Sequence, residues 1–140
     1  MTPVAHEYPM TILEHHLDTF GHVNNAMYLQ LFETARWQWI TDGGDGFDTV
    51  RKTQQGPTVL ECTVKFQREL TNRHSVVIHT RLDDYTGKIG RVNQDIVRSD
   101  GEVCCQARFT LALFDLKARR LIAPTDAWLA SIGAEPTNRS

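Results

Sequence analysis

Residues 18–42 read DTFGHVNNAMYLQLFETARWQWITD, a short turn followed by a long stretch without proline or glycine. Gly21 can adopt a positive φ angle, and Asn24 or Asn25 can cap a helix, so we expect a loop over 18–25 that leads into a helix over Ala26–Asp42. Apolar side chains cover most of the circumference of that helix. A helix with this pattern is normally buried against other elements on nearly every side, which predicts a central helix.

After Pro57 the hydrophobic period changes from that of a helix to that of a strand. Apolar Leu60, Cys62, Val64 and Phe66 alternate with polar residues, which predicts a half-buried strand. We expect a first strand over Tyr8–Leu17 near a sheet edge because of Pro9, and we expect the remaining elements as strands over 76–82, 91–97 and 103–116, a short extension at 121–122 and a helix around 126–132.

The order of these elements predicts the fold class. One strand and one long helix are followed by strands whose short turns suit antiparallel pairing. An antiparallel sheet of five to six strands wrapped around the helix would bury it, so we predict an α+β fold. The strand over 103–116 is long enough to be the central strand of a curved sheet.

Length and charge point to one domain, over residues 1–140, with a disordered tail over 134–140. A net charge of −2 argues against partners bound by bulk charge, so we expect neither nucleic acid nor membrane. The three cysteines include the adjacent pair Cys104 and Cys105, which does not suit a disulfide framework. With no signal peptide or apolar membrane span in the sequence, we expect a cytoplasmic protein.

One motif carries a family resemblance. The pattern Asp-x-x-Gly-His-Val-Asn-Asn-x-x-Tyr over 18–28, followed by Glu-x-Ala-Arg-Trp over 33–37, resembles the hot-dog-fold thioesterases of the 4-hydroxybenzoyl-CoA thioesterase family. It is most similar to the bacterial long-chain acyl-CoA thioesterase branch, and the resemblance spans about residues 8–125. It implies a hot-dog fold, hydrolysis of fatty acyl-CoA without a cofactor, a role in fatty acid metabolism, and a homodimer or homotetramer with sites at the subunit interface.

Asp18 is the first candidate for the chemistry. It precedes a helix N-terminus, where unpaired N–H groups and the helix dipole favour negative charge. Such N–H groups could stabilise the oxyanion that forms from a thioester carbonyl, and Asp18 could attack that carbonyl directly or deprotonate a water. The local pattern alone favours an aspartate that only caps the turn. The resemblance implies that Asp18 is the catalytic carboxylate and that the backbone N–H of Asn25 polarises the carbonyl.

Three further candidates belong to the same part of the motif or to its helix. His22 could act as a base, but we favour a supporting role in which its imidazole bonds the loop. Tyr28 could line the acyl pocket. Glu33 and Arg36 are three residues apart and could simply pair on the helix surface, although other hot-dog thioesterases place a catalytic glutamate on this helix, which makes Glu33 a second candidate.

Coenzyme A requires cations for its phosphates, and Lys88 and Arg91 lie beside Gly87 and Gly90 in a region where the family places nucleotide contacts. They could also belong to an ordinary solvated turn. The six histidines show no spacing typical of metal ligands, so we expect no metal site.

Two other functions stay open at this point. The chain could be a thioesterase for aromatic acyl-CoA or for acyl-carrier protein. It could also be a non-catalytic domain that binds acyl-CoA or lipid, since a fold by itself does not prove an activity.

Overall fold

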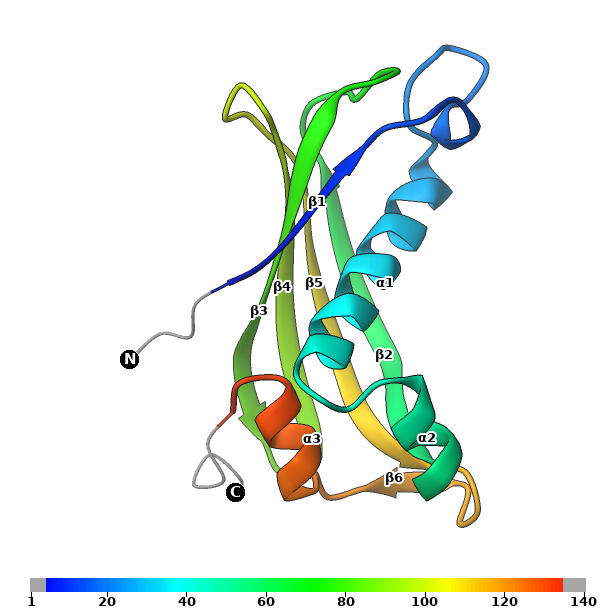
Figure 1. The fold of residues 1–140 in the computed structure, drawn as a ribbon, viewed down its shortest axis with the longest axis vertical. Coiled ribbons are helices and arrows are strands. Elements are labelled where there is room, and N and C mark those ends of the chain that lie inside the picture. The colour runs from blue at the N-terminus through cyan, green and yellow to red at the C-terminus, as the bar shows by residue number, and fades with distance from the viewer. Residues whose placement is uncertain (1–4, 135–140) are drawn as a thin grey trace.

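The computed structural model describes residues 5–134 and shows one long helix lying along an antiparallel sheet (Figure 1). The sheet has the order β1-β3-β4-β5-β2, with β6 paired to β5. Its strands are β1 (His6–Thr11), β2 (Gln55–Phe66), β3 (Ser75–Thr86), β4 (Ile89–Arg98), β5 (Val103–Asp115) and β6 (Arg120–Ile122). The helices are α1 (Asn25–Asp42), α2 (Phe47–Thr53), α3 (Asp126–Ser131) and the short 3₁₀ helix η1 (Glu14–His16). This arrangement confirms the predicted α+β sheet around one helix.

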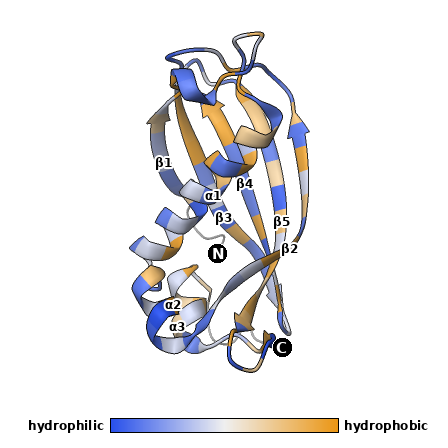
Figure 2. Cartoon of the chain, turned by 90° about the vertical axis from the view of Figure 1, so that its right-hand side faces the viewer, coloured by the Kyte–Doolittle hydropathy of each residue, from blue (hydrophilic) through white to orange (hydrophobic). Residues whose placement is uncertain are grey.

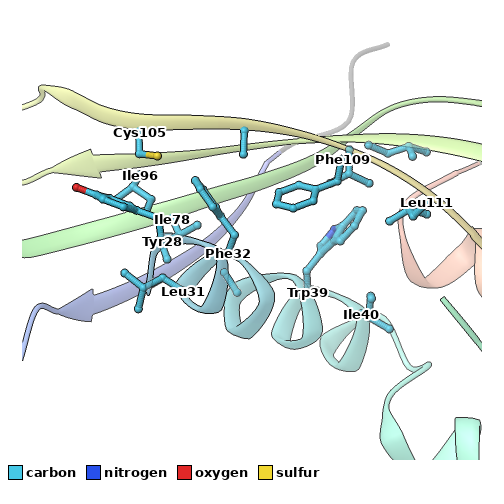
Figure 3. Close-up of a cluster of buried hydrophobic side chains, with 14 of the residues drawn as sticks. Tyr28, Leu31, Phe32, Trp39, Ile40, Ile78, Ile96, Cys105, Phe109 and Leu111 are labelled. Carbon is cyan, nitrogen blue, oxygen red and sulfur yellow. The ribbon is translucent and has the colours of Figure 1, made fainter. Parts of the chain in front are cut away.

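Local interactions define both ends of α1. The Asn24 side chain accepts a hydrogen bond from the Ala26 N–H at 2.8 Å, as expected for an N-cap, and Gly43 ends the helix. The face toward the sheet is buried and packs on residues such as Ile78, Ile96 and Phe109 (Figure 3).

The opposite side of α1 is open, which corrects the expectation of burial on nearly every side. Leu29 is 41% exposed, and Glu33 and Thr34 are also exposed. The apolar side chains of α1 therefore extend around more of the helix than one sheet can cover.

The edge strands of the sheet differ from its central strand in pairing and in burial. The central position of β5 is confirmed, because β5 pairs with β4, β2 and β6. By contrast, β2 pairs with β5 alone among the described strands and lies at the edge of the sheet, as Figure 2 shows. The half-buried strand expected there is instead mostly exposed, with Leu60 at 47% and Phe66 at 52%. Pro9 and Pro57 lie in the two edge strands, where a missing N–H disrupts no ladder.

The expected first strand, Tyr8–Leu17, is wrong in its second half. β1 ends at Thr11, and η1 follows. The Leu13 N–H donates to Nδ1 of His16 at 2.9 Å, while the His16 N–H donates to the Leu13 carbonyl at 3.0 Å. These reciprocal bonds close a turn that the apolar pattern does not reveal.

The C-terminal elements agree with expectation, while α2 was not anticipated. β6 and α3 lie where the extension and the terminal helix were predicted. Ala134, which the predicted tail included, is 7% exposed and packs in the core. The remainder of that tail, 135–140, lies outside the described residues. Within residues 5–134 no helix is long and apolar enough to cross a membrane.

Candidate active site

Asp18 is held in a tight turn by its own side chain. Its Oδ1 accepts hydrogen bonds from the N–H groups of Phe20 at 2.9 Å and His22 at 3.2 Å, and its N–H donates to the His22 carbonyl at 2.8 Å. Gly21 occupies the position with φ +80°, which other residues rarely adopt. Among the described residues no donor bonds Oδ2. One carboxylate oxygen therefore anchors the turn, and the other is left for chemistry.

The first turn of α1 supplies an unused donor beside this turn. Asn24 caps the helix through its side chain, and its carbonyl accepts the N–H groups of Met27 at 2.9 Å and Tyr28 at 3.3 Å. The N–H of Asn25, the first helical residue, has no acceptor anywhere in residues 5–134. This is the backbone group that the family resemblance assigns to carbonyl polarisation, and it is free to bond a ligand.

Asp18, His22, Asn25 and Tyr28 share one cavity of about 250 Å³. The Tyr28 ring is 4% exposed and meets the Phe66 ring edge to face, with centroids 5.4 Å apart. Burial of the ring raises the pKa of Tyr28 to about 12. The remaining walls of the cavity come from Val23, Phe66, Gln67, Arg68 and Glu69.

Glu69 is a cavity residue that sequence reasoning missed. Its Oε2 lies 2.9 Å from Nε2 of His22, so the imidazole is held by a carboxylate on the segment between β2 and β3. Two backbone contacts fix that segment beside the turn: Val23 N–H donates to the Leu70 carbonyl at 2.9 Å, and His22 forms a bridge with Thr71. No local motif connects Glu69 to His22, because only the sheet topology brings the two segments together.

Three candidates lie outside the cavity. Glu33 is exposed on α1 and does not line it. Lys88 is in the β3–β4 turn, and Arg91 contacts Asp84 at 3.3 Å. That hairpin packs on α3, since Tyr85 Oη accepts a hydrogen bond from Trp128 Nε1 at 3.0 Å.

The α3 helix marks the far end of the molecule from Asp18. It lies against the C-terminal end of α1, where Gly43 packs directly on the Ser131 backbone (Figure 1). Because α1 has 18 residues, its two ends are about 27 Å apart. Lys88 and Arg91 therefore do not reach the cavity of their own chain.

Other concave surfaces carry none of the predicted catalytic groups. A larger groove of about 590 Å³ is lined by residues of β1, β3 and β4 together with the turn after β4. We take the smaller cavity as the candidate site because it is lined by Asp18 and Asn25, whose Oδ2 and N–H are unbonded among the described residues. Within residues 5–134 no cluster of three or more histidine, cysteine, aspartate or glutamate side chains could hold a metal ion.

Comparison with known proteins agrees with this architecture. Residues 13–132 match the thioesterase-like superfamily. The long-chain acyl-CoA thioesterase FadM of Escherichia coli (strain K12) is 30% identical over 110 residues, which cover 78% of this chain and 83% of FadM. The crystal structure of YbaW, a probable thioesterase from Escherichia coli, superposes with a TM-score of 0.79 at 25% identity, covering 89% of this chain and 94% of YbaW.

A further structure supports the fold alone. The hypothetical protein SAV2348 from Staphylococcus aureus, solved in complex with CoA, has a TM-score of 0.88 at 16% identity, covering 100% of this chain and 89% of that one. The hot-dog fold predicted from the motif is thereby confirmed. Since the family match extends over nearly all of the described residues, the chain belongs to the thioesterase-like superfamily and is a thioester hydrolase.

Proposed function

We propose that this protein hydrolyses fatty acyl-CoA to free fatty acid and coenzyme A, with Asp18 as the catalytic carboxylate. The observation that carries the proposal is that one cavity is lined by Asp18, whose Oδ2 is unbonded among the described residues, and by Asn25, whose N–H is likewise unbonded. The long-chain acyl-CoA substrate named for FadM supports the choice of acyl group.

In this mechanism the Asn25 N–H bonds the thioester oxygen and stabilises the negative charge that develops there. Asp18 acts by one of two routes. It takes a proton from a water, whose hydroxide adds to the carbonyl carbon, or it attacks that carbon itself to form an anhydride that water then opens. On either route the carbon–sulfur bond breaks, and the thiolate of coenzyme A takes up a proton. His22, held by Glu69, supports the turn that presents Asp18.

The test is thiol release from palmitoyl-CoA by the wild type and by Asp18→Asn. We expect the variant to lose about 1,000-fold or more in kcat while binding acyl-CoA as before, because the amide keeps the shape of the side chain and removes its basicity. Glu33→Gln is the matched control on α1 and should retain activity. Full activity in Asp18→Asn together with loss of activity in Glu33→Gln would identify Glu33, instead of Asp18, as the catalytic carboxylate.

A substrate panel decides between the remaining possibilities. Benzoyl-CoA and acyl-carrier protein loaded with palmitate should be hydrolysed more slowly than palmitoyl-CoA. A wild type that binds palmitoyl-CoA but releases no thiol from any of the three would identify a binding domain instead. Single-turnover hydrolysis in H₂¹⁸O with enzyme in excess over substrate can identify direct attack. ¹⁸O in the Asp18 carboxylate requires an anhydride that water opens at the aspartyl carbon, whereas the general-base route leaves all of the ¹⁸O in the fatty acid.

We further propose a homodimer that pairs along β2. This edge strand is 12 residues long, carries the exposed Val59 and Leu60, and contributes Phe66 to the cavity wall. A second copy would cover these side chains and the unpaired edge of the strand. Val59→Lys should shift sedimentation from dimer to monomer, whereas Phe47→Lys, which alters an apolar residue of α2 that is 69% exposed, should not.

Contact of coenzyme A phosphates with Lys88 and Arg91 stays a prediction. Because both residues lie at the far end of α1 from Asp18, such contact would need a second chain to bring them to the cavity. The tetramer and the cytoplasmic location also stay predictions.

A further inference from the structure

Two buried tyrosines differ in what their hydroxyl groups bond. Tyr28 and Tyr85 are each 4% exposed. The hydroxyl of Tyr85 accepts the Trp128 indole N–H at 3.0 Å, as buried tyrosines usually require. The hydroxyl of Tyr28 has no hydrogen-bond partner within the part of the chain that the structure describes.

The Tyr28 hydroxyl is nevertheless not sealed in the core. Among residues 5–134 the one buried side-chain nitrogen or oxygen without a partner is His6 Nδ1, so the Tyr28 oxygen has accessible surface. Tyr28 lines the site cavity, and we infer that the accessible surface of its oxygen faces that cavity. Figure 3 shows the hydroxyl at the end of the aromatic cluster, pointing away from the rings of Phe32, Trp39 and Phe109.

The ring that carries this hydroxyl is rigidly placed. It is buried in the core and packs edge to face on Phe66 at 5.4 Å. Tyr28 follows Asn25 by three residues, so the two lie on the same side of α1 and face the same cavity. The hydroxyl and the free Asn25 N–H are thus two unused donors presented by the first turns of one helix.

The Tyr28 hydroxyl keeps its proton and can therefore donate a hydrogen bond. Burial, followed by the nearby Cys105 and Cys104 and by the carboxylates of Asp18 and Glu69, raises the pKa of Tyr28 to about 12. The group therefore keeps its proton at neutral pH and can bond an acceptor, but it cannot serve as a base.

We propose that the Tyr28 hydroxyl is a second hydrogen-bond donor to the thioester carbonyl oxygen, acting with the Asn25 N–H as that oxygen becomes an oxyanion. This inference rests on the proposed function. It makes Tyr28 a catalytic residue, whereas the sequence suggested only a lining of the acyl pocket.

Tyr28→Phe tests the proposal because it removes one oxygen and keeps the ring. We expect kcat for palmitoyl-CoA to fall about 100-fold with KM within about twofold, since a donor to the oxyanion acts in the transition state. The melting temperature should not fall, because the hydroxyl bonds no group among residues 5–134. Tyr85→Phe is the matched control: it should lower the melting temperature by leaving the Trp128 N–H unpaired, and it should leave kcat unchanged.

Two results would overturn the proposal. One is unchanged kcat in Tyr28→Phe, and the other is a rise in KM alone, which would indicate contact with the substrate ground state. In either case hydrolysis by the wild type together with loss in Asp18→Asn would leave the proposed function intact.

A readout that needs no turnover completes the test. The carbonyl stretch of palmitoyl-CoA bound to Asp18→Asn should shift to higher wavenumber when Tyr28→Phe is added, because one donor to the oxygen is lost. An identical stretch in the single and double variants would refute the role of Tyr28 even if no variant hydrolyses the substrate.

Discussion

A buried hydrogen-bond network joins α1 to the middle of the sheet and allows a quantitative prediction. Gln94, which is 0% exposed, accepts a hydrogen bond from Arg36 Nη1 at 3.0 Å. Its Nε2 donates to the Phe32 carbonyl at 3.0 Å and to Thr80 Oγ1 at 2.9 Å. Arg36 is 7% exposed, with its guanidinium 4.4 Å from the Phe109 ring centroid, and within the described chain no carboxylate lies within 4 Å of it. Gln94 is therefore its bonded acceptor inside the core.

Gln94→Leu removes this acceptor while keeping an apolar side chain of similar size. The buried guanidinium is then left without a bonded acceptor. Because the group is charged, the resulting loss in the free energy of unfolding exceeds the roughly 1–3 kcal/mol typical of a neutral group. Burial of the leucine side chain offsets part of this loss. We expect a net loss of about 3 kcal/mol in the free energy of unfolding. For a chain of this length that corresponds to a fall of roughly 10 °C in melting temperature.

The double variant Arg36→Met/Gln94→Leu gives the decisive comparison. Removing both partners takes the charge out of the core, so its cost should be at least about 1.5 kcal/mol smaller than the sum of the two single variants. Urea unfolding of all four proteins at one protein concentration measures this difference. Costs that add to within about 0.5 kcal/mol would show that Gln94 does not stabilise the buried charge.

Two further predictions concern packing and pH. Gly90→Ala should lower stability by about 1–3 kcal/mol in urea unfolding, because a Cβ there would lie 2.6 Å from Cε2 of Tyr85; unchanged stability would mean that the ring moves aside freely. Hydrogen bonds from Arg98 lower the pKa of Asp100 below its usual 3.8, so the ion pair stabilises the fold above that pH and the contribution is lost as pH falls toward the lowered pKa. Asp100→Asn should therefore make stability less pH-dependent below about pH 4, and an unchanged pH dependence of stability in that range would contradict this.

Sequence and structure agree where a hydrophobic period within one segment encodes the element, and they differ where other contacts decide it. α1 and β5 are encoded by periodic patterns within one segment, and both were predicted. η1 depends on a bond between the His16 ring and the backbone of Leu13, which has no hydrophobic period. β2 shows the correct alternation, yet its burial depends on its place at the sheet edge rather than on its own residues.

The site divides in the same way. The motif over 18–28 places Asp18, His22, Asn25 and Tyr28 within one turn and the start of one helix, so the sequence alone brings them together. The partner of the His22 ring, Glu69, arrives from the segment after β2 and could not be predicted. Lys88 and Arg91 looked compatible with the site, and the sheet carries them to the far end of α1.

By itself, the sequence determined the order and type of the main elements, the family, and the local group of residues around Asp18, because each depends on spacing along one segment. Only the tertiary structure decided which side of α1 stays open, that Oδ2 of Asp18 and the Asn25 N–H are the unused groups, and that the hydroxyl of Tyr28 faces the cavity while that of Tyr85 is bonded. The unused groups of Asp18 and Asn25 follow from the geometry of one turn and one helix start, whereas the open side of α1 and the surroundings of the two tyrosines depend on partners distant in the chain. Two identical side chains with different neighbours therefore differ in what their hydroxyl groups bond.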